Sequence, residues 1–266
     1  MNNIICLLVF NFLFLIILCI LMLTSSFWLF FTFIVLFITI YFLLLRKLMS
    51  NINVWIVVFT IIIDILIMLF LLFYGINTKF LKTYTNMDFS IETYTSAVDK
   101  DSDGIDDQTD ILNNAYKYIS TKPKYKSKYY GTGYPDDSYG VCTDVVAFSL
   151  LNAGYDLMEL VNEDIKLHRD DYNIDVIDKN IDFRRVKNLN VYFSHTAISL
   201  TVDINKIDEW QGGDIVVFKH HIGIVSDKRN SKGIPLIIHH ANEFQKNYVE
   251  DILESHNDII GHYRIS

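Results

Sequence analysis

Three long apolar runs in the first 76 residues constrain the fold of this 266-residue chain more than any other feature. They extend over approximately residues 4–23, 27–45 and 54–76. Of the 23 basic and 31 acidic residues, this region contains only Arg46, Lys47 and Asp64. A helix needs about 20 apolar residues to cross a bilayer, whereas a signal peptide has one shorter apolar core. The sequence therefore predicts a transmembrane anchor of three α-helices over residues 1–76, with the lipid bilayer as a partner.

Residues 77–266 have the composition of an acidic, water-exposed domain. Nearly all the charged residues and all eight histidines fall here, and acidic residues outnumber basic ones. Nucleic-acid binding depends on clustered Lys and Arg, so nucleic acid is excluded as a partner. Cys142 is the only cysteine of this region, because Cys6 and Cys19 lie in the first apolar run. An intradomain disulfide is therefore impossible, and a hydrophobic core must hold the domain together.

The sequence after the third apolar run predicts a polar stalk over residues 77–98 and a calcium-binding loop over residues 99–110. Carboxylates occupy loop positions 1, 3, 5, 9 and 12, which are Asp99, Asp101, Asp103, Asp107 and Asp110. Gly104 at position 6 permits the sharp turn that such loops need. This spacing is typical of loops that bind Ca²⁺, so Ca²⁺ is expected as a structural cofactor. The alternative is a solvated acidic linker.

Periodicity beyond the loop favours helices first and strands later. A first helix is predicted from four apolar residues at helical spacing, Ile111, Leu112, Ala115 and Ile119. It should end before Pro123, and a second helix should begin near Cys142 and end at Gly154. Short apolar runs separated by turn residues predict strands at residues 214–218, 221–225 and 236–239. This order of elements predicts an α+β fold.

Cys142 is the strongest candidate for a catalytic residue. It lies at the expected start of a helix, where the helix dipole and the free N–H groups favour a thiolate. Such a nucleophile also needs an imidazole base that a third polar group orients. His221 and His239, on neighbouring predicted strands, are the candidates for base and orienting residue. The alternative is a buried, inert thiol, as most single cysteines are.

Six segments within residues 105–266 together resemble the NlpC-type cell-wall cysteine hydrolases, papain-related enzymes that cut amide bonds in bacterial peptidoglycan. They are GVCTD at 140–144, WQGGDIV at 210–216, HIGIVSD at 221–227, IH at 238–239, NIDFRRV at 180–186 and GHYR at 261–264. The last two are shared with a bacterial branch of unknown function. The resemblance implies that Cys142 is the nucleophile, His221 the base and His239 the orienting residue. The expected fold class is therefore α+β, a papain-like or NlpC-like domain preceded by three transmembrane α-helices.

The expected function is hydrolysis of amide bonds, most of all in peptidoglycan stem peptides, through a Cys-His-His arrangement. Arg184 and Arg185 are expected to bind carboxylates of a stem peptide, or else to pair with acidic residues of the domain. Asp144 is expected to shape the substrate pocket or to cap the helix. This chain has Cys142-Thr143-Asp144 where the commoner motif has Cys-Ser-Gly. Substrate preference and the bond cleaved are therefore not carried over from the family.

Two other functions stay open at this point. A thiol acyltransferase or hydrolase of the same fold would act on another amide or ester, and a non-catalytic module would only bind a ligand, calcium included. Arg46 and Lys47 favour a cytoplasmic loop between the second and third runs, whereas Lys79 and Lys82 favour the reverse orientation. Calcium and a wall substrate both favour an external domain. The expected location is a multi-pass protein of the cell membrane with its domain outside the cell.

Overall fold

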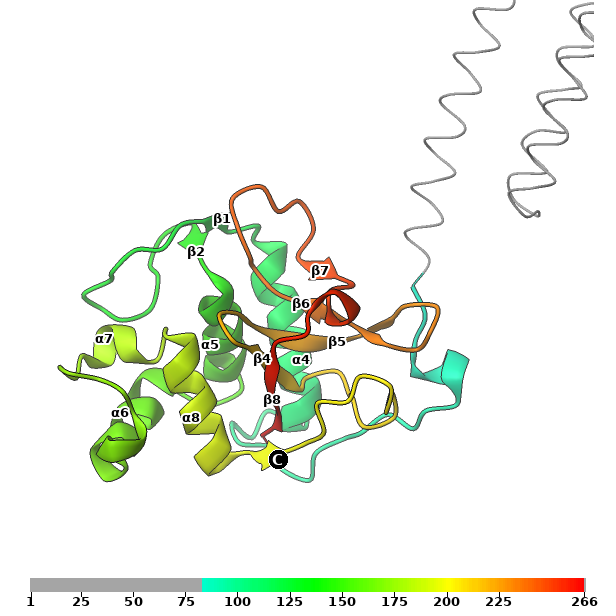
Figure 1. The fold of residues 1–266 in the computed structure, drawn as a ribbon, viewed down its shortest axis with the longest axis horizontal. Coiled ribbons are helices and arrows are strands. Elements are labelled where there is room, and N and C mark those ends of the chain that lie inside the picture. The colour runs from blue at the N-terminus through cyan, green and yellow to red at the C-terminus, as the bar shows by residue number, and fades with distance from the viewer. Residues whose placement is uncertain (1–82, 266) are drawn as a thin grey trace, which may run out of the picture. The chain divides into compact units, whose positions relative to one another are not determined.

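The computed structural model describes residues 83–265, which form five α-helices and two β-sheets (Figure 1). None of the helices in this range is long and apolar enough to cross a membrane. The three predicted transmembrane helices fall within residues 1–76, outside the described residues. The expected fold class is therefore corrected, because residues 83–265 show helices, one antiparallel sheet and one parallel pair of strands, and no membrane-spanning helix among them.

Residues 83–98, the described part of the predicted stalk, pack against the rest of the domain. The backbones of Tyr84 and Arg229 exchange two hydrogen bonds, of 2.8 and 2.7 Å. The short 3-10 helix η2 (Asn86–Phe89) follows, and its Asn86 is buried. Asn86 Oδ1 accepts a hydrogen bond of 2.6 Å from Arg229 Nε. The segment is therefore part of the folded domain instead of a free stalk.

The two helices predicted from periodicity are confirmed. α4 (Asp107–Ser120) begins after Asp106, whose carboxylate caps it by accepting a hydrogen bond from the Thr109 N–H. α5 (Cys142–Asn152) ends shortly before Gly154, which adopts a φ of +84°. The buried apolar residues of both helices belong to the same hydrophobic cluster.

Three further helices, which were not predicted, follow α5. They are α6 (Leu157–Leu167), α7 (Lys179–Asp182) and α8 (Val186–Thr196). Two short 3-10 helices, η3 (Arg169–Asp171) and η4 (Leu253–Ser255), complete the helical part of the described residues. The carboxylates of Asp156 and Asp178 cap α6 and α7. α8 buries Leu189 and Phe193, which lie four residues apart and so on one face.

The main sheet has six antiparallel strands in the order β3-β8-β4-β5-β6-β7. Their bounds are β3 (Ile198–Ser199), β4 (Ile215–Phe218), β5 (Ile222–Arg229), β6 (Pro235–Ile238), β7 (Val249–Glu250) and β8 (Ile259–Arg264). The three predicted strands correspond to β4, β5 and β6 and are confirmed, whereas β3, β7 and β8 were not predicted. A separate parallel pair joins β1 (Lys124–Tyr125) to β2 (Tyr139–Gly140).

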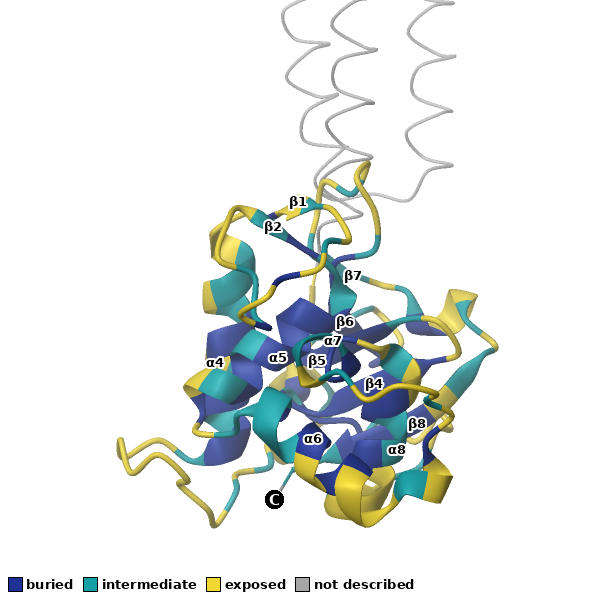
Figure 2. Ribbon diagram, turned by 90° about the vertical axis from the view of Figure 1, so that its left-hand side faces the viewer, coloured by how far each residue is buried: buried dark blue, intermediate teal, exposed yellow. Residues whose placement is uncertain are grey.

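Both faces of the central strands are buried (Figure 2). Along β4, Ile215 and Val217 belong to a core cluster shared with α4, α5 and α8. Val216 and Phe218 belong to a second cluster around Trp210. Successive side chains of a strand point to opposite faces, so a strand covered on both faces needs a continuous apolar run.

A buried ion pair joins the start of β4 to β8. Asp214 is fully buried and accepts hydrogen bonds from Arg264 Nε at 2.7 Å and Arg264 Nη2 at 2.8 Å. Its Oδ2 also lies 3.0 Å from His262 Nε2, and the ring of Trp210 stacks on His262 at a centroid distance of 3.8 Å. The segments WQGGDIV and GHYR thus bind each other, which gives both a structural role.

Candidate active site

Cys142 is the first residue of α5 and is half-buried. Asp144 fixes this helix start, because its Oδ2 accepts a hydrogen bond of 2.8 Å from the Val141 N–H. The backbone N–H groups of Ile222 and Thr143 interact with the thiol. Ile222 is the first residue of β5 and directly follows His221. The fold therefore brings the thiol to the strand end at which His221 lies.

A hydrogen-bonded chain of three side chains lies at the ends of β5, β6 and β7. His221 Nε2 is 2.9 Å from His239 Nδ1, and His239 Nε2 is 3.1 Å from Glu250 Oε2. A carboxylate accepts hydrogen bonds only, so His239 carries its proton on Nε2 and accepts at Nδ1. His221 then carries its proton on Nε2, and its Nδ1 keeps a free electron pair. The chain thus fixes the tautomer in which Nδ1 of His221 is a base.

Gly223 lets β5 and β6 approach each other closely beside these imidazoles. A Cβ atom at this position would lie 2.6 Å from Ile237 Cγ2, 2.8 Å from Ile238 O and 3.2 Å from His239 Cβ. All three distances are shorter than van der Waals contact, and one of them is to a backbone oxygen. Any larger residue would displace β6 and, with it, His239. Only glycine is therefore compatible with the spacing of the two histidines.

Burial keeps the thiol and both imidazoles neutral. It raises the pKa of Cys142 to about 11, although the N–H groups of Ile222 and Thr143 act in the opposite direction. It lowers the pKa of His221 to about 4 and that of His239 to about 3. The prediction that the helix start lowers the thiol pKa is therefore wrong for this structure, because desolvation of the thiolate outweighs the N–H groups.

Arg184 and Asp144 pair with each other deep in the domain. Arg184 Nε donates to Asp144 Oδ1 at 2.6 Å and Arg184 Nη2 donates to Asp144 Oδ2 at 2.9 Å. The third nitrogen, Nη1, donates to the carbonyl of Lys128 at 2.8 Å. The expectation that Arg184 and Asp144 contact a substrate is corrected, because their hydrogen-bonding groups face one another. The pair instead holds the start of α5, where Cys142 lies.

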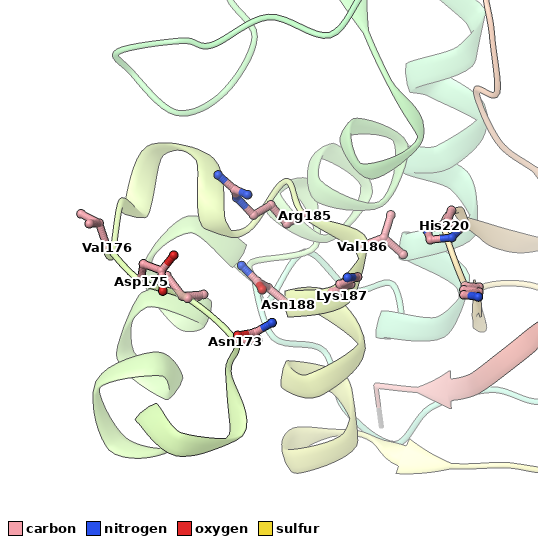
Figure 3. A pocket seen from close by; sticks show the side chains of 10 residues that line it. Asn173, Asp175, Val176, Arg185, Val186, Lys187, Asn188 and His220 are labelled. Atoms are coloured by element: carbon pink, nitrogen blue, oxygen red, sulfur yellow. The ribbon is translucent and has the colours of Figure 1, made fainter.

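Arg185, in contrast, is exposed and lines a pocket of about 600 Å³. The pocket lies between α8, the segment before α7 and the turn between β4 and β5 (Figure 3). Its basic residues are Arg185, Lys187, Lys219 and His220, and its one acidic residue is Asp175. A basic pocket in an acidic domain is suited to bind an anionic group.

This basic pocket adjoins the candidate catalytic residues along the chain on two sides. His220 directly precedes His221. Arg185 directly follows Arg184, whose carbonyl accepts a hydrogen bond of 3.3 Å from Thr143 Oγ1, next to Cys142. Cys142, His221 and His239 are not among the residues that line the pocket, so the two sites are neighbours along the chain only.

The predicted calcium ligands fall into two groups. One carboxylate oxygen from each of Asp99, Asp101 and Asp103 lies within 4.8 Å of the others. Asp107 and Asp110 belong to the first turn of α4. All five lie in the segment that precedes or opens α4, away in sequence from Cys142 and the two histidines.

The sequence did not indicate Glu250, the third member of the hydrogen-bonded chain, or Gln245, which contacts two of its members. Glu250 accepts from His239, and Gln245 Nε2 lies 3.3 Å from both Glu250 Oε2 and the His239 carbonyl. Glu250 is one of 31 acidic residues and belongs to a strand of only two residues. Its place follows from the pairing of β7 with β6, which aligns Ile238 with Val249.

A model of the domain of unknown function DUF1287 matches residues 112–265. The uncharacterized protein YijF of Escherichia coli (strain K12) is 36% identical over 167 residues, which cover 58% of this chain and 80% of YijF. No solved structure matches the chain. The prediction of a family of unknown function is confirmed, whereas the likeness to NlpC-type hydrolases stays a prediction. The matched residues include Cys142, His221, His239 and Glu250. The chain therefore belongs to the DUF1287 family.

Proposed function

We propose that this protein is a cysteine hydrolase that cleaves an amide bond by acyl transfer, with Cys142 as the nucleophile. The observation that carries the proposal is the hydrogen-bonded chain from Glu250 through His239 to His221. This chain leaves Nδ1 of His221 as a base, one residue from the Ile222 N–H that interacts with the Cys142 thiol. A nucleophile, a base and an orienting group in this order are the parts that nucleophilic catalysis needs.

The reaction would begin from a neutral thiol and a neutral imidazole, as the directions of their pKa shifts require. As the Cys142 sulfur bonds to the substrate carbonyl carbon, His221 Nδ1 takes the thiol proton. N–H groups at the start of α5 would stabilise the negative carbonyl oxygen. His221 then gives the proton to the leaving amine, and the C–N bond breaks to leave a thioester on Cys142.

Water would complete the cycle. His221 Nδ1 takes a proton from the water molecule as its oxygen bonds to the thioester carbon. The C–S bond then breaks, the proton returns to the sulfur, and a carboxylic acid is released. Glu250 and His239 act as positioning residues, because they hold His221 in the required tautomer.

Peptidoglycan stem peptides are the substrate class that we propose. They carry free carboxylates, and the basic pocket, which His220 also lines, offers Arg185, Lys187 and Lys219 for binding such groups. The resemblance of the segments around Cys142, His221 and His239 to NlpC-type wall hydrolases supports the same class. Such a substrate requires the catalytic residues to act outside the cytoplasm.

The test is a digest of purified peptidoglycan and of soluble stem peptides with the full-length protein. New amine termini, identified by labelling and mass spectrometry, are expected with the wild type. Cys142→Ala should release none, because no other group can form the thioester. Cys6→Ala is the matched control, since it removes a thiol from another part of the chain and should release amines at the wild-type rate.

Two results would contradict the proposal. Equal amine release by Cys142→Ala and the wild type would show that the thiol takes no part. Release of no amine from any wall peptide by a folded wild-type protein would exclude peptidoglycan as the substrate.

A further inference from the structure

The acidic loop that precedes α4 is the strongest feature that the proposed function does not use. It lies before residue 112, where the match to the family begins. Its carboxylates from Asp99, Asp101 and Asp103 are exposed and have oxygens within 4.8 Å of one another. Like charges at this distance repel each other, and a bound cation would remove that repulsion.

The loop backbone holds these three carboxylates in place. Asp99 Oδ2 accepts a hydrogen bond of 2.9 Å from the Gly104 N–H, and Asp103 Oδ1 accepts one of 2.8 Å from the Ile105 N–H. Gly104 has a φ of +92°, which favours glycine there. Among the described residues, none donates a hydrogen bond to Oδ2 of Asp101 or of Asp103. Those oxygens are available as ligands.

Asp110 is the independent observation that points to a cation. Its side chain belongs to α4, and the residue is only 7% exposed. Its Oδ2 is buried and has no hydrogen-bond partner among the described residues. Its carboxyl interacts electrostatically with the carboxylates of Asp103 and Asp101. A buried oxygen without a partner costs free energy unless a ligand satisfies it.

Asp107, which the sequence also predicted as a ligand, has a different role. Its Oδ1 accepts a hydrogen bond of 2.8 Å from the Lys100 N–H, and its Oδ2 accepts one from the Tyr155 hydroxyl. Tyr155 lies just beyond the end of α5. Asp107 therefore joins the loop to the segment just after α5. The prediction that Asp107 is a calcium ligand is corrected, because both of its oxygens accept hydrogen bonds from the protein.

We propose that Asp99, Asp101, Asp103 and Asp110 bind one Ca²⁺ ion at the start of α4. Ca²⁺ takes six to eight oxygen ligands in a flexible arrangement, and carboxylates with water supply them. Mg²⁺ demands a smaller octahedral site and releases its water reluctantly, so it fits a four-carboxylate loop less well. The ion would fix the loop to α4, and through Asp107 to α5.

The proposal is tested by calorimetric titration of CaCl₂ into the full-length protein after removal of divalent cations with a chelator. We expect one binding site, and a rise in the melting temperature of roughly 5–10 °C at a Ca²⁺ concentration one hundred times Kd. Asp110→Asn and the exposed Asp101→Asn should each weaken binding about tenfold or more, since ligand charge sets the affinity of such loops. Asp136→Asn is the matched control and should bind Ca²⁺ as the wild type does, because Asp136 is exposed and lies outside the loop.

Absence of both heat and a melting shift at about 10 mM Ca²⁺ would overturn the proposal, since this exceeds the Kd of the weakest known modules about tenfold. Wild-type affinity in both Asp110→Asn and Asp101→Asn would overturn it as well. The use of two variants, one buried and one exposed, separates loss of a ligand from loss of folding. These measurements do not depend on peptide cleavage. The proposal of a calcium site and the proposal of hydrolase activity can therefore be contradicted independently of each other.

Discussion

Replacement of His221 by Gln is expected to lower kcat/KM for amide cleavage about one hundred- to ten-thousandfold, the usual contribution of a positioned base. Glutamine is similar in size but has no nitrogen that accepts a proton near neutral pH. Glu250→Leu should have a smaller effect, because His221 remains but His239 no longer holds its tautomer. His168→Gln is the control, since His168 is exposed and belongs neither to the hydrogen-bonded chain nor to the basic pocket.

The pH profile of the wild type tests the same role. Burial, together with the charge of His256, lowers the pKa of His221 to about 4. The imidazole is therefore a free base above that pH, and the acid limb of kcat/KM should lie near pH 4. The folded domain also loses stability as pH falls from about 6.5, because the unfolded chain binds protons that the buried histidines do not. Circular dichroism at each pH separates the two effects, and an acid limb near 6.5 in folded protein would contradict the assignment.

Replacement of Arg184 by Met is expected to lower the free energy of unfolding by about 3–5 kcal/mol. The substitution leaves the carboxylate of Asp144 fully buried without its two charged hydrogen bonds. Denaturation by urea measures the change directly. The double variant Arg184→Met with Asp144→Leu should recover part of the loss, because it removes the unpaired charge.

Arg185→Met is the matched substitution at the adjacent position. The Arg185 side chain is 60% exposed, so the free energy of unfolding should change by less than about 0.5 kcal/mol. Its effect should fall on KM for peptides with free carboxylates, with kcat little changed. Unchanged stability of Arg184→Met together with a raised KM would contradict this division of roles and favour Arg184 as a substrate ligand.

The sequence predicted those elements whose signal is local. α4 and α5 have apolar residues at helical spacing, and β4 to β6 are continuous apolar runs. α8 has the same kind of local signal, because its buried residues Leu189 and Phe193 lie at helical spacing. β3 and β7 have only two residues each, and they become strands through pairing with β8 and β6.

The residues of the candidate site were likewise predictable only where their signal is local. Cys142 was identified because it lies at a predicted helix start, and His221 and His239 because they lie on predicted strands. The partner of Asp144 lies 40 residues away, and no local rule selects Arg184 over Arg185. The thiol pKa was predicted in the wrong direction, because the helix start is local whereas burial depends on the whole core. Glu250 was not predicted, because only the pairing of β7 with β6 brings it close to His239.

The most direct test of acyl transfer at Cys142 is to digest stem peptides in the presence of hydroxylamine. A thioester on Cys142 would react with hydroxylamine as well as with water, so a peptide hydroxamate should form beside the free acid, and mass spectrometry identifies both. Cys142→Ala should form neither product. Amine release without any hydroxamate, or hydroxamate formation by Cys142→Ala, would contradict a covalent intermediate on this residue.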